Sequence, residues 1–305
     1  MQDNAALTFA GFPSSDSHPP KDCRTAVVGI PYYCEYPGQT ANSAHAPAVI
    51  RQESNRYPDD PLAWDFDLGQ PLSEICAGKV VDLGDLPVFP LQVDHNREVI
   101  QSTIKNIIKT GALPVVLGGD DSIPIAVLNS YQDEEPFYVL QLDAHIDWRD
   151  DVMGIREGYS STMRRASEMA WVKGIIQVGA RGVGSARREE HQAAMDYGAQ
   201  LIPARDFHRF GVQSVLDMLP NNCRVFLTID FDVLDPAIMP AVGAPTPGGL
   251  SFQETVDLIH AAANQFRVLG ACLVELAPNA DINHLGAITA MRLIWNTIGA
   301  LTLNQ

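Results

Sequence analysis

The sequence predicts an α/β protein built on a mostly parallel sheet with helices on both faces. Short apolar, β-branched runs alternate along the chain with longer amphipathic stretches. Single helices between consecutive strands are typical of crossover connections, which join parallel strands. The expected strands are nearly continuous apolar runs, as strands buried on both faces usually are.

Seven strands and eight helices are expected in a single domain. The strands are TAVVGI (25–30), KVVDLG (79–84), LPVVLGG (113–119), FYVLQLD (137–143), GIIQVGA (174–180), RVFLTIDFD (224–232) and VLGACLVEL (268–276). The helices are expected near residues 47–56, 92–110, 123–130, 161–170, 186–197, 211–218, 252–265 and 284–303. Residues 1–22 are rich in Ser, Pro and Asp and are expected to form an extended N-terminal arm, which leaves 23–305 as the single globular domain.

The composition favours cations over nucleic acid as partners. Among 305 residues, 21 Lys and Arg stand against 37 Asp and Glu, which gives a formal net charge of −16. Such a chain is repelled by phosphate backbones and by anionic membrane surfaces. No apolar run approaches the roughly 18 residues of a membrane span, and no signal peptide is recognisable. Five cysteines without a CxxC pair fit reduced thiols, so we expect a cytoplasmic protein.

Acidic residues gather where three of the expected strands end. These ends read GGDDS (118–122), DAHID (143–147) and DFDVLDP (230–236). Ligands of open α/β sheets bind at the carboxyl ends of the strands, so the three segments should meet in one cleft. Alternate residues of an extended chain share a face, which would point the acidic side chains of each segment the same way.

Carboxylates this close together would repel one another unless cations bind between them. Oxygen ligands with an imidazole suit Mn²⁺, Mg²⁺ or similar ions, and the lack of thiolates argues against a structural zinc site. The number of ligands favours two ions, which can turn a shared water into a nucleophile near neutral pH. Asp235 is interpreted as a turn former, and Asp120 as a residue that supports the ligands.

In combination, these motifs resemble the ureohydrolases, the family of arginase, agmatinase, guanidinobutyrase and formiminoglutamase. The resemblance starts at APAVIR (46–51), includes ELAPNAD (275–281) and reaches the last expected helix. It implies a three-layer α/β/α sandwich around an eight-stranded parallel sheet, and a homo-oligomer of three or six chains. It also implies two divalent ions, Mn²⁺ in most members and Ni²⁺ in some, held by Asp121, Asp143, His145, Asp147, Asp230 and Asp232.

The resemblance further implies a reaction: a metal-activated water attacks the carbon of a substrate guanidinium, and urea and an amine are released. By the same resemblance, Asp147 orients that water, and Glu275 pairs with the guanidinium through a charge-assisted contact.

Two positions depart from the family pattern. Asp121 stands where the family has a histidine ligand, and YSSTMRR (159–165) replaces a loop that usually contains a histidine. The extra carboxylate makes a hydroxide-bearing two-metal centre about −2 rather than about −1 in charge, which favours hard cations and makes bound water less acidic. Tyr159 is expected either to close the pocket and donate a hydrogen bond or simply to pack within its loop.

Residues 148–161 lie where members of the family contact the far end of the substrate, although most of the charged side chains there are expected to form a solvated loop. Three acids there suit an agmatine-like cation, the favoured substrate, and two arginines suit the carboxylate of a guanidino acid. These are Asp150, Asp151 and Glu157 on one side, and Arg149 and Arg156 on the other. Guanidine, methylated guanidines and biguanides of the metformin type are the alternatives, because Trp148 and Tyr159 could narrow the pocket.

A different class of function is a non-catalytic partner subunit that joins a related chain in a hetero-oligomer. The altered residues Asp121 and Tyr159 suggest this reading. Metal content separates the two, since an active enzyme should carry about two ions per chain.

Overall fold

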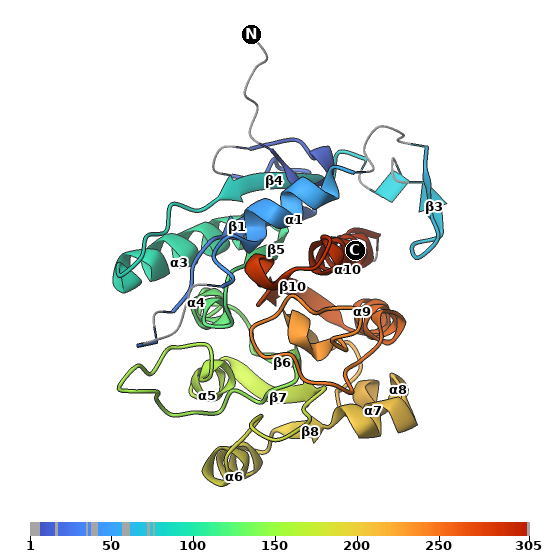
Figure 1. The fold of residues 1–305 in the computed structure, drawn as a ribbon. Helices are drawn as coiled ribbons and strands as arrows, with labels where there is room; N and C mark the ends of the chain where they lie inside the picture. Colours follow the sequence, from blue (N-terminus) through green and yellow to red (C-terminus); the bar gives the residue numbers. More distant parts are fainter. Residues whose placement is uncertain are drawn as a thin grey trace.

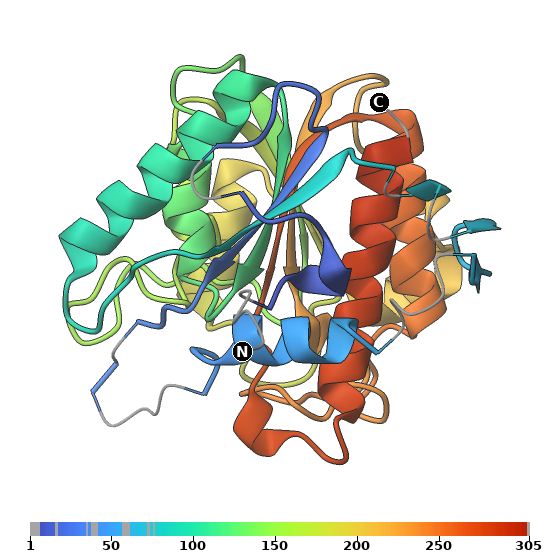
Figure 2. The same ribbon diagram turned by 90° about the horizontal axis from the view of Figure 1, so that it is seen from above.

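The computed structural model describes residues 7–15, 18–34, 36–37, 42–56, 62–71, 74–75 and 77–303. Their centre is an eight-stranded sheet in the order β4-β1-β5-β10-β9-β6-β7-β8. Every neighbouring pair in this sheet is parallel. Helices α3, α4, α5 and α6 cover one face, and α1, α7, α8, α9 and α10 cover the other (Figures 1 and 2). The predicted three-layer α/β/α sandwich is therefore confirmed.

The strands of this sheet are β1 (Thr25–Ile30), β4 (Val80–Asp85), β5 (Leu113–Gly118), β6 (Phe137–Leu142), β7 (Val172–Val178), β8 (Gln200–Ile202), β9 (Arg224–Asp230) and β10 (Arg267–Val274). The α-helices that cover it are α1 (Ala46–Ser54), α3 (Val93–Thr110), α4 (Ile123–Asn129), α5 (Thr162–Ser167), α6 (Arg188–Tyr197), α7 (Ala204–Phe210), α8 (Gln213–Leu216), α9 (Phe252–Gln265) and α10 (Leu285–Leu303). A two-stranded hairpin, β2 (Trp64–Asp65) and β3 (Gln70–Pro71), lies apart from the sheet.

Alternation along the strands builds two hydrophobic cores, one under each helical layer. On β6, Leu140 and Leu142 pack into one core, while Phe137 and Val139 pack into the other. Because side chains of a strand point alternately to its two faces, a continuous apolar run fills both cores at once. Burial of both faces fixes the register of the central strands and hence the positions of the segments that follow them.

All seven expected strands form, but the eighth strand and one helix escaped prediction. β8 has only three residues, of which Ile202 alone is buried, so it carries no apolar run. The helix expected over 211–218 is shorter, and α7 precedes it. Gly211 separates the two, since its φ of 69° is a left-handed conformation that ends α7.

The N-terminal segment packs on the body of the protein. Phe9 and Phe12 are buried, and both rings stack on Trp295 of α10. The backbone N–H of Asp82 in β4 donates to Pro13 O at 3.0 Å, and the N–H of Ser15 donates to Asp82 O at 3.2 Å. The domain boundary at residue 22 stays a prediction, and residues 1–6 and 16–17 lie outside the described part of the chain.

None of the helices in the described ranges combines the length and apolar character that a membrane crossing requires.

Candidate active site

Four neighbouring strands bring the acidic segments together. β5, β10, β9 and β6 lie side by side in the middle of the sheet. Because parallel strands all end at the same edge, the segments that follow them converge there. A cavity of about 430 Å³ opens at this edge, and seven predicted site residues line it: Asp121, His145, Asp147, Tyr159, Asp230, Asp232 and Glu275. The eighth, Asp143, is fully buried against them.

Two compact groups of possible metal ligands form at this cavity. One contains Asp143, His145 and Asp232, and the other contains Asp121, Asp143 and Asp147. Within each group the ligand atoms lie within 4.8 Å of one another. Asp143 belongs to both groups, so the arrangement could hold two cations that share one carboxylate.

The segment after β9 adopts a different conformation from the one expected. The strand stops at Asp230, and residues Phe231–Val233 form a single 3-10 turn instead of an extended continuation. Asp230 Oδ1 accepts the backbone N–H of Asp232 at 2.7 Å and so caps this turn. Asp230 lines the cavity but stands outside the two compact ligand groups.

Two of the acidic residues have left-handed backbone conformations. Asp147 has φ of 50° and Glu275 has φ of 71°, which costs a non-glycine residue roughly 1–3 kcal/mol. Hydrogen bonds to neighbouring segments hold both: Asp147 O accepts two N–H groups from the start of α5, and Glu275 N donates to Gly119 O at 2.8 Å. Glu275 Oε1 also accepts the N–H of Asp121 at 2.8 Å. Such imposed strain is frequent at functional sites.

Burial and mutual repulsion dominate the electrostatics of the cluster. Desolvation and then neighbouring carboxylates raise the pKa of four carboxyl groups well above their usual range: Asp121, Asp143, Asp230 and Glu275. Burial opposes the charge of His145, but its hydrogen bond to Asp232 and the surrounding carboxylates raise its pKa to about 9. Burial likewise opposes the charge of Asp232, but His145 Nδ1 lies 2.9 Å from Asp232 Oδ2, and this contact lowers the pKa of Asp232.

The chemistry of this donor set fits divalent cations. Both carboxylate oxygens of Asp121 are buried and have no hydrogen-bond partner among the described residues. A buried carboxylate without a donor is costly unless a cation binds it. Oxygen ligands with one imidazole suit Mn²⁺ or a similar ion.

We expect the metal-free protein to lose stability as the pH rises. A group whose pKa is higher in the folded chain than in the unfolded chain favours folding while it is protonated, and this stabilisation is lost as the pH climbs through the folded pKa. The raised carboxyl groups and His145 all act in this direction. The midpoint temperature of thermal unfolding of metal-stripped protein should therefore decrease as the pH is raised from about 5 to about 8.

Added Mn²⁺ should recover most of the lost stability at the higher pH. It should raise the free energy of unfolding by about 2.7 kcal/mol at a free concentration one hundred times its Kd. Scanning calorimetry at both pH values, with and without Mn²⁺, measures this. A midpoint independent of pH would contradict the expectation.

Comparison with known proteins agrees with this geometry. The model of the arginase family matches residues 23–299. An agmatinase of Pyrococcus horikoshii is 30% identical over 287 residues, which cover 92% of each chain. An N(1)-aminopropylagmatine ureohydrolase of Thermus thermophilus is 32% identical over 209 residues, 68% of each chain. The solved structure of proclavaminate amidinohydrolase from Streptomyces clavuligerus shares the fold, with a TM-score of 0.84, 24% identity and 98% of each chain covered.

This chain belongs to the arginase family. The resemblance read from its motifs is thereby confirmed.

In this arginase-family chain, Asp120 holds two segments next to the ligand residues in place. Its carboxylate accepts the N–H of Cys34 at 2.5 Å and that of Ser122 at 3.1 Å. Asp235 accepts three backbone N–H groups, from Ala237, Gly248 and Gly249, and so shapes its turn.

A pair of tyrosines forms one wall of the cavity in this arginase-family chain. The ring of Tyr159 lies 4.4 Å from that of Tyr36, and both residues line the cavity. Tyr159 thus packs against a tyrosine of the segment between β1 and α1 and also lines the cavity. Burial, followed by the nearby Tyr36, Glu275 and Asp120, raises the pKa of Tyr159, so its hydroxyl remains a neutral donor. Sequence reasoning missed Tyr36, because its loop carries no recognisable motif.

The structure places most of the expected far-end residues outside the cavity. Asp150 binds Arg165 at 2.7 Å, Asp151 accepts the N–H of Gly154 at 2.9 Å, and Glu157 pairs with Arg97. Arg156 points toward Asp150 and Glu168, also away from the cavity. The expected contacts of these four charged residues with the substrate are not supported, because their side chains bond within the loop and to α3 and α5. Other residues of the same loop do line the cavity: Trp148, Arg149 and Tyr159.

Arg149 does line the cavity, and it has an acidic neighbour that sequence reasoning missed. Its Nε lies 3.4 Å from Glu190 Oε1, and Glu190 lines the same cavity. Glu190 also caps α6, since its Oε2 accepts the N–H of Arg187 at 2.7 Å. Within the described part of the chain, Arg149 is the one lysine or arginine in the cavity wall.

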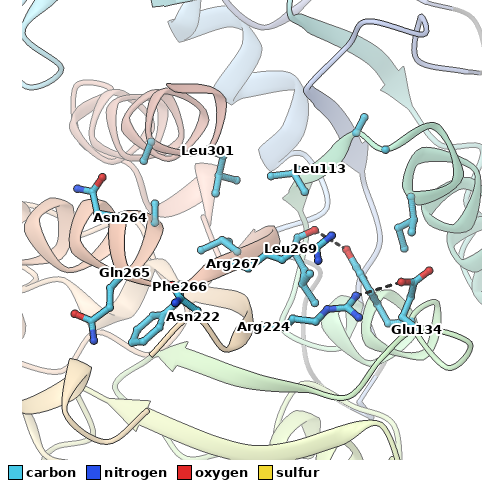
Figure 3. Close-up of a pocket in the computed structure, with 17 residues that line it drawn as sticks. Leu113, Glu134, Asn222, Arg224, Asn264, Gln265, Phe266, Arg267, Leu269 and Leu301 are labelled. Atoms are coloured by element: carbon cyan, nitrogen blue, oxygen red, sulfur yellow. Dashed lines mark hydrogen bonds and ion pairs between the residues drawn. The ribbon is translucent and has the colours of Figure 1, made fainter. Parts of the chain in front are cut away.

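A larger cavity, of about 560 Å³, lies at the opposite edge of the sheet (Figure 3). It is bordered by the first residues of β5, β9 and β10, the strand ends farthest from the acidic cluster. Arg224 in it pairs with Glu134 at 3.2 Å, and Tyr131 donates to Leu269 O at 2.9 Å. No metal-ligand group of the described residues occurs there, so the acidic cavity is the better candidate.

Proposed function

We propose that this arginase-family chain is a metal-dependent amidinohydrolase that hydrolyses a guanidino C–N bond and releases urea and an amine. The observation that carries the proposal is the pair of ligand groups that share Asp143, next to the carboxylate of Glu275 in one cavity. The relatives named agmatinase and N(1)-aminopropylagmatine ureohydrolase support the same reaction class.

The ions would be held by Asp121, Asp143, His145, Asp147, Asp230 and Asp232. We propose Mn²⁺ as the first choice, with Ni²⁺ as the alternative, because the oxygen-rich set favours hard cations. Two bound divalent ions supply Lewis acidity and lower the pKa of bound water.

The chain's own residues would orient the reaction. Glu275 uses Oε1 for the N–H of Asp121, which leaves Oε2 to accept an N–H of the substrate guanidinium. Asp147 faces the same cavity and would orient the attacking water and carry its proton toward the leaving amine. Tyr159, a neutral donor in the cavity wall, would hydrogen-bond the substrate and exclude water.

The far end of the substrate would lie along Arg149 and Glu190. An agmatine-like cation is the substrate that the named relatives suggest, and Glu190 is the acid that could meet its ammonium group. Arg149 supports a second candidate, a guanidino acid, because its guanidinium can donate to a carboxylate. Guanidine and methylated guanidines are smaller and would fill less of the cavity, whereas metformin-type biguanides are as large as agmatine but lack the terminal ammonium group that Glu190 could meet.

A urea-release screen tests the function. Metal-stripped full-length protein is loaded with Mn²⁺ or with Ni²⁺ and offered agmatine, 4-guanidinobutyrate, guanidine, methylguanidine and metformin. Urea from at least one substrate, with about two ions bound per chain, is expected. Full metal content without urea from any of them, and without dimethylamine from metformin, would contradict catalysis and favour a partner subunit in a hetero-oligomer.

The Arg149→Gln variant should separate the two substrate classes. Loss of the guanidinium should raise KM for 4-guanidinobutyrate by about 10–100-fold, because a charge-assisted contact contributes roughly 1.5–3 kcal/mol. KM for agmatine should be unchanged or lower, since a positive charge is removed. Steady-state kinetics measure both, with Arg156→Gln, which lies off the cavity, as the matched control. Equal effects of the two variants would contradict the assignment.

We also propose a cytoplasmic homo-oligomer of three or six chains, or a hetero-oligomer with a related chain. Sedimentation of the purified protein, alone and co-expressed with such a chain, tests the assembly.

A further inference from the structure

Three buried polar side chains, two amides and one indole, form a series of hydrogen bonds that ends at the metal-ligand groups. Gln141, Gln177 and Trp148 are each at most 2% exposed, although the rest of β6 is apolar. Gln141 on β6 and Gln177 on β7 are partners in the parallel register. Trp148 directly follows Asp147 in the segment after β6. Burying three polar side chains is costly unless each makes its hydrogen bonds, so their arrangement requires a reason.

The hydrogen bonds of these residues form one directed chain. Trp148 Nε1 donates to Gln177 Oε1 at 2.6 Å, and Gln177 Nε2 donates to Gln141 Oε1 at 2.5 Å and to Ile146 O at 2.8 Å. Gln141 Nε2 then donates to Asp143 Oδ2 at 2.7 Å and to Asp147 Oδ2 at 3.0 Å. Both N–H bonds of each amide are used.

Only one orientation of the two amides satisfies this chain. The indole N–H of Trp148 can donate but cannot accept, so it requires the carbonyl oxygen of Gln177 on its side. The NH₂ group of Gln177 then faces Gln141, which turns the NH₂ group of Gln141 toward the carboxylates. The indole N–H of Trp148 therefore fixes the amide orientations such that Asp143 and Asp147 each accept one N–H bond from Gln141.

We propose that Gln141, oriented by Gln177 and Trp148, is a positioning residue for the metal centre. Its NH₂ group bridges the carboxylates of Asp143 and Asp147, fixes their orientation, and reduces their repulsion without adding net charge. Both carboxylates belong to the group formed with Asp121, whereas the other group contains only Asp143 of the two. Gln141 therefore sets the affinity of the Asp121 group for its ion more than that of the group containing His145.

The inference rests on the proposed metal centre, and metal binding tests it without any measurement of turnover. Mn²⁺-loaded full-length protein is titrated with a chelator, and the two dissociation constants are obtained for wild type and variants. Gln141→Leu should weaken one of the two by about 10–100-fold, the usual effect of losing a partner that orients a metal ligand. The other constant should change by less than about threefold. Trp148→Phe removes the N–H that orients the chain together with part of the buried ring that packs on Tyr197, and it should weaken the same constant to a smaller extent.

Thr228→Val is the matched control. Thr228 is the register partner of Gln141 on β9, is fully buried, and its hydroxyl has no partner among the described residues. It should leave both constants unchanged, and thermal unfolding of the loaded variants checks that each is folded. Wild-type affinities in Gln141→Leu, or an equal loss in Thr228→Val, would overturn the inference while leaving the metal centre intact. Failure of the wild type to bind either Mn²⁺ or Ni²⁺ would overturn the proposed function and this inference together.

Discussion

The Asp232→Asn variant is expected to lose urea release by at least about a thousandfold, because one ion and its activated water would no longer be held. Asp232 is central to its ligand group: Oδ2 lies 2.9 Å from His145 Nδ1, and Oδ1 accepts the N–H of Ala144 at 3.0 Å. Asparagine keeps the shape and can still bond Ala144, but it removes the charge that would hold the metal and that pairs with His145.

Initial rates of urea release and bound metal per chain should be measured together. Metal content near one ion per chain is expected in place of about two. Asp196→Asn, an exposed aspartate on α6, is the control and should retain full activity. Turnover preserved in Asp232→Asn would remove the basis for placing the ions at this cavity.

The Asp121→His variant is expected to shift the pH optimum for kcat/KM downward by about one unit. Replacing a carboxylate by a neutral imidazole makes the centre one charge less negative, which lowers the pKa of metal-bound water. The wild type should accordingly have an alkaline optimum. The direction is consistent with the surroundings of Asp121, where burial raises its pKa and the negative charges of Asp147 and Glu275 raise it further.

Profiles of kcat/KM against pH for wild type, Asp121→His and Asp121→Asn decide the matter. Asparagine removes the same charge but is a poorer ligand, so it should lower metal affinity while the optimum of the remaining activity moves in the same direction. Identical profiles for wild type and Asp121→His would rule out charge at this position as the cause of the optimum.

The acidic segments were predictable because each follows a long apolar strand, and parallel strands bring such ends to one edge of a sheet. The local geometry was harder to predict. Asp232 lies in a 3-10 turn, and Asp147 is left-handed, so the side chains meet without the strand-like alternation on which the prediction relied. The sharing of Asp143 depends on atomic positions that spacing along the chain does not determine.

Contacts between distant segments were beyond sequence reasoning. Glu190 caps α6 and meets Arg149 only because α6 starts beside the cavity, and nothing in its local sequence indicates this. Nothing in the local sequence of Tyr36 indicates its place in the cavity wall either. The strand β8 and the helix α7 were missed for a different reason: both are short and have little apolar periodicity.

The packing of residues 7–15 against β4 has a consequence for solubility. β4 is the outermost strand on its side, and an outer strand offers unpaired N–H and C=O groups to any other extended chain. Pro13 and Ser15 occupy those groups of Asp82, while Phe9 and Phe12 anchor the segment on Trp295. The segment thus shields the sheet from adding foreign strands, so its loss would favour aggregation even with the catalytic cavity intact.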